Sequence, residues 1–220
     1  MRAYQVLRLY TYFRSSAAYR VRIALNLKGL AYEAIPVHLL LSGGEQHGAA
    51  FVDQNPAHLV PVLEDATLVL TQSLAIIEYL EETYPTPALL PGRAAERAKV
   101  RAVALAIACD VHPLNNLRVM QYLGGNLGAS EEARSAWSHH WIELGFSALE
   151  RHLAESGSGG SFCYGDTPTL ADCCLVPQVF NARRAKCVLD GYPTLMRIYE
   201  NCIRLPAFER AAPGAQPDAE

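Results

Sequence analysis

The sequence predicts a small α/β domain followed by an all-helical domain, and three observations carry this prediction. Up to about residue 88, apolar patterns with the two-residue period of strands alternate with helical patterns. A segment rich in proline and ending in a glycine follows, from Tyr84 to Gly92. Beyond it, nearly every apolar pattern has a helical period. We therefore place the domains at residues 1–88 and 93–212, and we expect residues 213–220 to be disordered.

The first domain is predicted to run strand, helix, strand, and then hairpin and helix. The segments predicted as strands are 6–12, 32–37, 59–63 and 68–70, and those predicted as helices are 17–28 and 74–84. Ser15 and Ser16 provide capping hydroxyls for the first helix, Gly29 ends it, and Ser73 is predicted to cap the second. Pro61 belongs at a strand start or edge, because it has no N–H for a ladder.

The second domain is predicted to contain only helices and loops. Helices are expected over residues 94–123, 131–155, 170–184, 194–201 and 207–211, with a Gly/Ser-rich loop at 156–161. Pro113 should bend or interrupt the first of these helices. Thr169 and Asp172 have the spacing of a capping box, so they should begin the helix at Leu170.

Composition excludes several classes of protein. The chain has 220 residues, 50% of them hydrophobic, and a net charge of -3. That is too apolar for a disordered chain and too acidic for general binding to nucleic acid or anionic membranes. No apolar run reaches the roughly 18 residues of a membrane-spanning helix. Any anionic ligand must therefore be bound locally.

Basic residues are concentrated at the N-terminus. Residues 1–30 contain six Lys and Arg and no acidic residue, whereas the remainder of the chain is net negative. A mitochondrial transit peptide is one interpretation of such an N-terminus. The strand and helix patterns in the same residues favour folded structure with a local affinity for anions.

The cysteines predict neither disulfides nor a metal site. The chain has six of them, at positions 109, 163, 173, 174, 187 and 202, and none forms a C-x-x-C pair. A chain of this size has a sufficient core without disulfides. We expect reduced, mostly buried thiols in a cytoplasmic protein that binds no metal.

Two helix starts in the first domain suggest a ligand site. The N-terminus of a helix attracts anions, and hydroxyls are present at Ser15 and Ser16 in one case and at Ser73, after Gln72, in the other. In an open α/β sheet, such helix starts meet at the carboxyl ends of the strands. The backbone at Val60, before a proline, is suited to pairing with an extended peptide. The pattern predicts a short, acidic, peptide-like ligand.

The segment from Ser15 to Leu25 resembles the signature S-S-C-x-x-R-V-R-I-A-L of zeta-class glutathione transferases. Asn55-Pro56, Val60-Pro61 and Gln72-Ser73 are similar to glutathione-site segments of that family. Thr167-Pro168-Thr169-Leu170-Ala171-Asp172 resembles its helix-capping motif. The resemblance covers about residues 5–212 and points to the maleylacetoacetate and maleylpyruvate isomerases.

The resemblance implies a thioredoxin-like domain, a cis peptide before Pro61, an all-α domain and a homodimer. Glutathione is the implied cofactor, with Ser15 and Ser16 facing its sulfur. The residues implied to bind the rest of glutathione are Gln46, His58, Val60, Gln72 and Ser73, joined from the second domain by His112 and Asn116.

The implied reaction is the cis–trans isomerisation of a maleyl diketo acid in aromatic or tyrosine catabolism. Addition of a thiolate to the conjugated double bond allows rotation, and elimination regenerates the thiol. Guanidinium groups suit the two carboxylates and the enolate of this substrate. The candidates are Arg14, assigned a catalytic role beside the serines, Arg118 and Arg183, with Arg184 competing for the role of Arg183.

One residue departs from the zeta signature. Ala17 stands where the signature has cysteine, so chemistry that requires this cysteine is excluded. Isomerisation is less affected, because its sulfur belongs to glutathione, and maleylpyruvate-type members also lack the cysteine. Two alternatives stay open: a transferase that conjugates small electrophiles, and a non-catalytic scaffold of the same fold.

Overall fold

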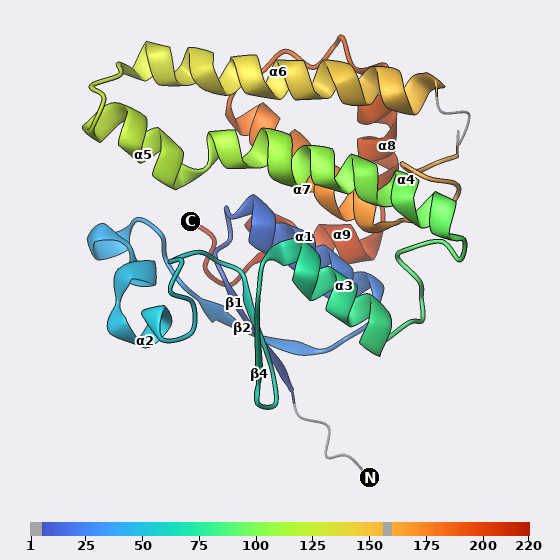
Figure 1. Cartoon of the computed structure of the whole chain (residues 1–220), viewed down its shortest axis with the longest axis horizontal. Coiled ribbons are helices and arrows are strands. Elements are labelled where there is room, and N and C mark those ends of the chain that lie inside the picture. Colours follow the sequence, from blue (N-terminus) through green and yellow to red (C-terminus); the bar gives the residue numbers. More distant parts are fainter. Residues whose placement is uncertain (1–5, 156–159) are drawn as a thin grey trace. The chain divides into compact units, whose positions relative to one another are not determined.

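The computed structural model describes residues 6–155 and 160–220 (Figure 1). Arg2 of the basic N-terminus and most of the predicted Gly/Ser-rich loop lie outside the described residues. The chain divides into two compact units, one of residues 1–89 together with 205–220 and one of residues 90–204. Each unit is described by itself below.

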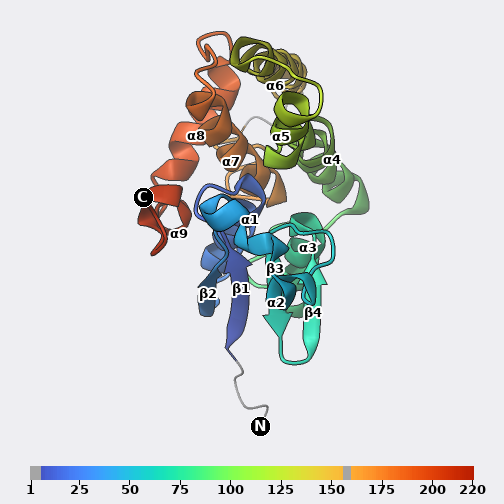
Figure 2. The same cartoon turned by 90° about the vertical axis from the view of Figure 1, so that its left-hand side faces the viewer.

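The first unit is built on a four-stranded mixed sheet. Its strands are β1 (Leu7–Thr11), β2 (Tyr32–Pro36), β3 (Val62–Asp65) and β4 (Leu68–Thr71), in the order β2-β1-β3-β4 (Figure 2). β1 pairs parallel with β2 and antiparallel with β3, and β3 and β4 form the predicted hairpin. Successive side chains of a strand point to opposite faces of the sheet. In β1 every second side chain, those of Leu7, Leu9 and Thr11, is therefore buried.

Two helices of the α/β pattern pack against each other in this unit. They are α1 (Ser16–Leu27) and α3 (Ser73–Thr83). Their apolar faces include Val21, Leu25 and Ile76, all fully buried. A separate cluster contains Tyr12 and Phe51, the latter from the short α2 (Ala49–Val52). The turn before α2 contains the 3-10 segments η1 (Leu41–Gly43) and η2 (Glu45–His47).

The end of the first unit differs from our expectation. Helix α9 (Pro206–Ala211) packs against α1 and belongs to the α/β unit rather than to the helical domain (Figure 1). Residues 213–220, expected to be disordered, contain the 3-10 turn η5 (Pro213–Ala215) and are held by hydrogen bonds. Gln216 donates to the carbonyl oxygens of Arg210 and Ala212, and such side-chain anchors leave no periodic signal in the sequence.

The second unit is entirely helical in its regular structure. Its helices are α4 (Ala94–Leu105), α5 (Leu117–Gly125), α6 (Glu131–Glu155), α7 (Leu170–Arg184) and α8 (Pro193–Ile203). The predicted long helix is interrupted around Pro113 by a π-helical segment, η3 (Ala106–Val111), and a 3-10 turn, η4 (His112–Asn115). α7 packs against α4 and α8, and most of its side chains are buried.

The capping-box residues fix the start of α7. The Asp172 carboxylate accepts from the Thr169 N–H at 2.7 Å and from the Thr169 hydroxyl at 2.8 Å. Its other oxygen accepts from the Cys163 N–H at 2.8 Å, which ties the preceding loop to the helix. Burial raises the pKa of Asp172, while these hydrogen bonds favour the charged form.

The cysteines are free thiols, as predicted, and four of the six are buried. Cys187 is partly buried and Cys109, on η3, is exposed. Among residues 6–155 and 160–220, no helix has the length and apolar character needed to cross a bilayer.

Candidate active site

Ser15 is the N-cap of α1. Its Oγ accepts a hydrogen bond from the Ala18 N–H at 3.2 Å, and its backbone is extended, as an N-cap requires. A hydroxyl that accepts through a lone pair still has its proton to donate elsewhere. Ser15 is half-buried and Ser16, the first helical residue, is buried. The helix N-terminus and the Ser15 O–H group thus provide a partial positive charge and a donor, which suit a thiolate.

The second helix start is linked to α1 by a buried arginine. Arg20, on α1, donates from Nη1 to the Oγ of Ser73 at 3.2 Å. This hydrogen bond joins the second turn of α1 to the first residue of α3. The structure also corrects one assignment, because Gln72 is the N-cap of α3 and Ser73 is its first residue. Gln72 is exposed, and its positive φ of 69° turns the chain from β4 into the helix.

Gln46, in η2, and His58 lie together in the part of the chain that precedes β3. The carbonyl oxygen of Gln46 lies 3.1 Å from Nδ1 of His58, so these two predicted ligands of glutathione are neighbours. The Gln46 side chain is buried, and its Oε1 has no hydrogen-bond partner among the described residues. An unsatisfied buried acceptor is costly unless a donor arrives, and a peptide ligand supplies amide N–H groups.

The turn before Val60 is fixed by Asn55. Its Nδ2 donates to the Leu59 carbonyl oxygen at 2.7 Å, and its Oδ1 accepts from the Ala57 N–H at 3.1 Å. Val60 follows directly and is joined to Pro61 by a cis peptide bond, which confirms that expectation. The segment thus presents the backbone of Val60 immediately before strand β3.

Most of the basic residues near the N-terminus are engaged in the fold rather than in binding an anion. Arg22 is fully buried and donates to backbone and side-chain oxygens within the first unit. Lys28 is buried and pairs with Glu81 at 2.7 Å. Arg8 forms exposed ion pairs with Glu33 and Glu64. The charge pattern alone therefore overstates the anion affinity of this segment.

Arg14 is the basic residue that stays partly exposed beside the serines. Its guanidinium lies over the ring of Phe13, 4.8 Å from the centroid, and the side chain is 38% exposed. Arg14 immediately precedes the cap of α1, so its charge lies next to the Ser15 hydroxyl in the chain. This position agrees with a role in binding an acidic ligand.

Three predicted site residues lie where the first long helix of the helical unit is interrupted. His112 begins η4, and Asn116 is the N-cap of α5, where its Oδ1 accepts from the Arg118 N–H at 3.1 Å. The amide group of Asn116 keeps its two donors for other partners. The Arg118 side chain is exposed, and no ion pair is found for it among the described residues.

The two competing arginines at the end of α7 have different partners. Arg183 stacks on the Tyr199 ring at 4.4 Å and pairs with Glu200 at 3.2 Å, both on α8. Arg184 donates to Oδ1 of Asn181 at 3.0 Å. The structure thus places Arg183 against α8 and Arg184 against a side chain of its own helix.

The helical unit also contains a largely apolar cleft of about 490 Å³ between α4, η3 and α6. It is lined by Val103, Trp141 and Leu149 among others, with Asp110 and His152 as polar members. None of the predicted site residues lines it, although Val111 in its lining directly precedes His112. Within residues 6–155 and 160–220, no group of three or more His, Cys, Asp or Glu is placed to hold a metal ion.

Comparison with known proteins identifies the family. Residues 9–88 match the glutathione S-transferase N-terminal domain and residues 142–201 match the C-terminal domain. A probable maleylacetoacetate isomerase of Vibrio cholerae is 56% identical over 96% of this chain and 97% of its own length.

Solved structures agree with this relationship. The holo structure of a maleylpyruvate isomerase, a bacterial glutathione S-transferase of the zeta class, has a TM-score of 0.94 and 51% identity, and the match covers 97% of this chain and all of the other. A maleylacetoacetate isomerase of Methylobacterium extorquens AM1, solved with bound malonate and GSH, has a TM-score of 0.92 and 41% identity, covering 97% and 99% of the two chains. The chain therefore belongs to the glutathione S-transferase family, within its zeta class.

Proposed function

We propose that this protein is a glutathione-dependent cis–trans isomerase that converts a maleyl diketo acid, maleylacetoacetate or maleylpyruvate, to its fumaryl form. The observation that carries the proposal is the Ser15 hydroxyl at the N-terminus of α1, a helix that the Arg20–Ser73 hydrogen bond ties to the start of α3. Relatives that share this architecture along nearly their whole length are named for this reaction.

The residues of the first unit fit glutathione. The Ser15 hydroxyl and the N-terminus of α1 suit the sulfur, and the unsatisfied buried Oε1 of Gln46 suits an amide donor. We also assign Ser16 to the sulfur, and His58, the Val60 backbone, Gln72 and Ser73 to the rest of the tripeptide. Glutathione supplies, when bound, the thiol whose reversible addition allows rotation about the double bond.

The protein's own groups have three tasks in this reaction. The Ser15 O–H group donates to the sulfur and favours the thiolate over the thiol. Arg14 and Arg118 bind substrate carboxylates and stabilise negative charge on the oxygen of the enolate. Arg183 or Arg184 provides a further cation, and His112 and Asn116 contribute to glutathione binding. We further propose a cytoplasmic homodimer that acts in aromatic or tyrosine catabolism.

The direct test is turnover with and without glutathione. We expect the purified protein to isomerise maleylacetoacetate or maleylpyruvate only when glutathione is present, as followed by the change in absorbance of the diketo acid. Conjugation of a chlorinated aromatic without any isomerase activity would replace the proposal with an electrophile-conjugating transferase. Failure to bind glutathione in calorimetry would indicate a non-catalytic scaffold instead.

Arg118→Ala tests the substrate half of the proposal. We expect the variant to lose isomerase activity by about tenfold or more, because a guanidinium–carboxylate bond is charge-assisted. Glutathione affinity should stay nearly unchanged. Arg204→Ala, at the exposed C-cap of α8, removes an equal charge and serves as the control. A parallel loss of glutathione affinity and activity in Arg118→Ala would contradict the assigned role.

A further inference from the structure

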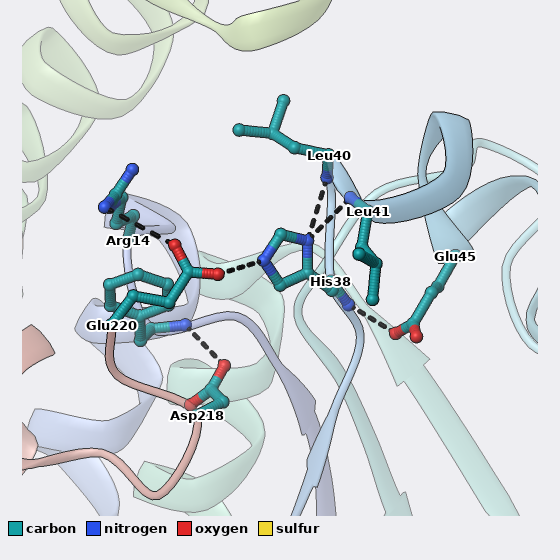
Figure 3. A network of polar contacts seen from close by, with 8 residues as sticks. Arg14, His38, Leu40, Leu41, Glu45, Asp218 and Glu220 are labelled. Carbon is teal, nitrogen blue, oxygen red and sulfur yellow. Dashed lines mark hydrogen bonds and ion pairs between the residues drawn. The ribbon is translucent and has the colours of Figure 1, made fainter.

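The carboxylate of Glu220 lies between two side chains of the first unit, Arg14 and His38 (Figure 3). Its Oε1 lies 2.8 Å from Nε2 of His38, and its Oε2 lies 3.7 Å from Nη2 of Arg14. His38 follows β2, and Arg14 lies between β1 and α1. No sequence pattern signals His38 as a site residue, because its pairing with Glu220 depends on the path of the chain after α9.

His38 is held in one orientation by the contacts of its Nδ1 atom. Its Nδ1 accepts from the backbone N–H of Leu41 at 2.8 Å and of Leu40 at 3.2 Å (Figure 3). Because Nδ1 acts as the acceptor, the ring proton is on Nε2, the atom that faces Glu220. The ring also makes a T-shaped contact with the ring of Tyr12, with the centroids 4.9 Å apart. His38 is therefore a donor already aimed at a carboxylate, even when the ring is neutral.

The last residues are anchored upstream of Glu220. Asp218 accepts a hydrogen bond from the Phe13 N–H at 3.0 Å, which fixes the chain two residues earlier (Figure 3). The Glu220 side chain itself is 58% exposed, whereas that of His38 is only 19% exposed. The two donors are thus built into the fold, while the carboxylate that they hold is close to solvent and readily replaced.

We propose that Arg14 and His38 form a carboxylate subsite for the acidic substrate, and that the Glu220 side chain competes for this subsite within the chain. The inference rests on the proposed function, because it places the subsite beside the Ser15 end of α1. His38 becomes a substrate-binding residue, and Glu220 must leave the pair before a substrate carboxylate enters. Exposed ion pairs are weak, so the competition should change affinity by about two- to fivefold.

The test compares Glu220→Gln with the wild-type protein in two measurements. We expect the variant to lower the KM for maleylpyruvate, and to lower the Kd for malonate in calorimetry, by about two- to fivefold. Glu209→Gln, on the exposed side of α9, removes the same charge within the same unit and should leave both values unchanged. Equal malonate affinity in Glu220→Gln and wild type would overturn the proposal. A shift confined to the KM for glutathione would overturn it as well, since it would assign the subsite to the tripeptide.

His38→Asn in the Glu220→Gln background tests the histidine. The Asn Oδ1 retains an acceptor for the N–H groups of Leu40 and Leu41, as in an Asx turn, but the Nε2 donor is lost. We expect the double variant to lose the gain in malonate affinity. Retention of the gain would show that His38 does not bind the carboxylate. The malonate measurement needs no turnover, so absence of isomerase activity would contradict the proposed function without deciding this inference.

Discussion

Ser15→Ala should reduce kcat by about a hundredfold at saturating glutathione, the usual cost of losing one hydrogen bond to a reacting anion. The Ser15 hydroxyl accepts from Ala18 and keeps its proton for the sulfur. Its loss should also raise the pKa of the bound thiol, which is read from the ultraviolet absorbance of the thiolate against pH. Ser15→Thr retains the hydroxyl and should recover most of the activity.

The same substitution removes a helix cap, so a structural loss must be separated from a chemical one. Losing the cap costs about 1 kcal/mol of folding free energy. Ser130 provides a matched control, because its Oγ accepts from the Ala133 N–H at 3.2 Å at the start of α6. Ser130→Ala should lose similar stability and almost no activity. Equal losses of activity in the two variants would show that Ser15 acts only as a cap.

Arg22→Met should destabilise the protein by about 3 kcal/mol, since buried oxygens then lose a charged donor. The guanidinium donates to the carbonyl oxygens of Phe13 and Ala211, both at 3.0 Å, and to Oγ1 of Thr11 at 2.9 Å. Burial lowers the pKa of Arg22 to about 10, so the group remains charged at neutral pH. The free energy of unfolding is measured by urea denaturation.

Arg8→Met is the control for this substitution. Arg8 has 44% of its side chain exposed and pairs with Glu33 and Glu64 on the outside of the sheet. Exposed pairs contribute at most about 1 kcal/mol, so this variant should unfold close to the wild type. If Arg22→Met lowers the free energy of unfolding by less than Arg8→Met does, the Arg22 hydrogen bonds make no net contribution to stability. We also expect Arg22→Met to raise the KM for glutathione, because Phe13 precedes the Arg14–Ser15 segment by only one residue.

Local patterns were sufficient for the elements but not for their long-range contacts. The alternation in β1 and the capping spacing of Thr169 and Asp172 depend on neighbours a few residues away, and both were predicted. The burial of Lys28 against Glu81, by contrast, joins residues that are far apart in the chain. Lysine is ordinarily a surface residue, so no sequence pattern signals such a pair.

In the candidate site, too, local features were predicted and long-range contacts were not. The hydroxyls of Ser15 and Ser73 were predicted from their positions at helix starts. The hydrogen bond from Arg20 to Ser73 was not predicted. Charged residues are ordinarily expected at the surface, whereas Arg20 is buried. His38 was missed for a different reason, since its ring is oriented by the backbone of Leu40 and Leu41 in a turn with no regular period.

The first unit is assembled from both ends of the chain, because α9 packs on α1 and supplies the Ala211 carbonyl oxygen to Arg22. The ribosome delivers these residues only after the whole helical unit has been synthesised. The α/β unit is therefore begun first in translation and completed last. Until α9 is synthesised, Arg22 lacks one of its hydrogen-bond acceptors, the Ala211 carbonyl oxygen.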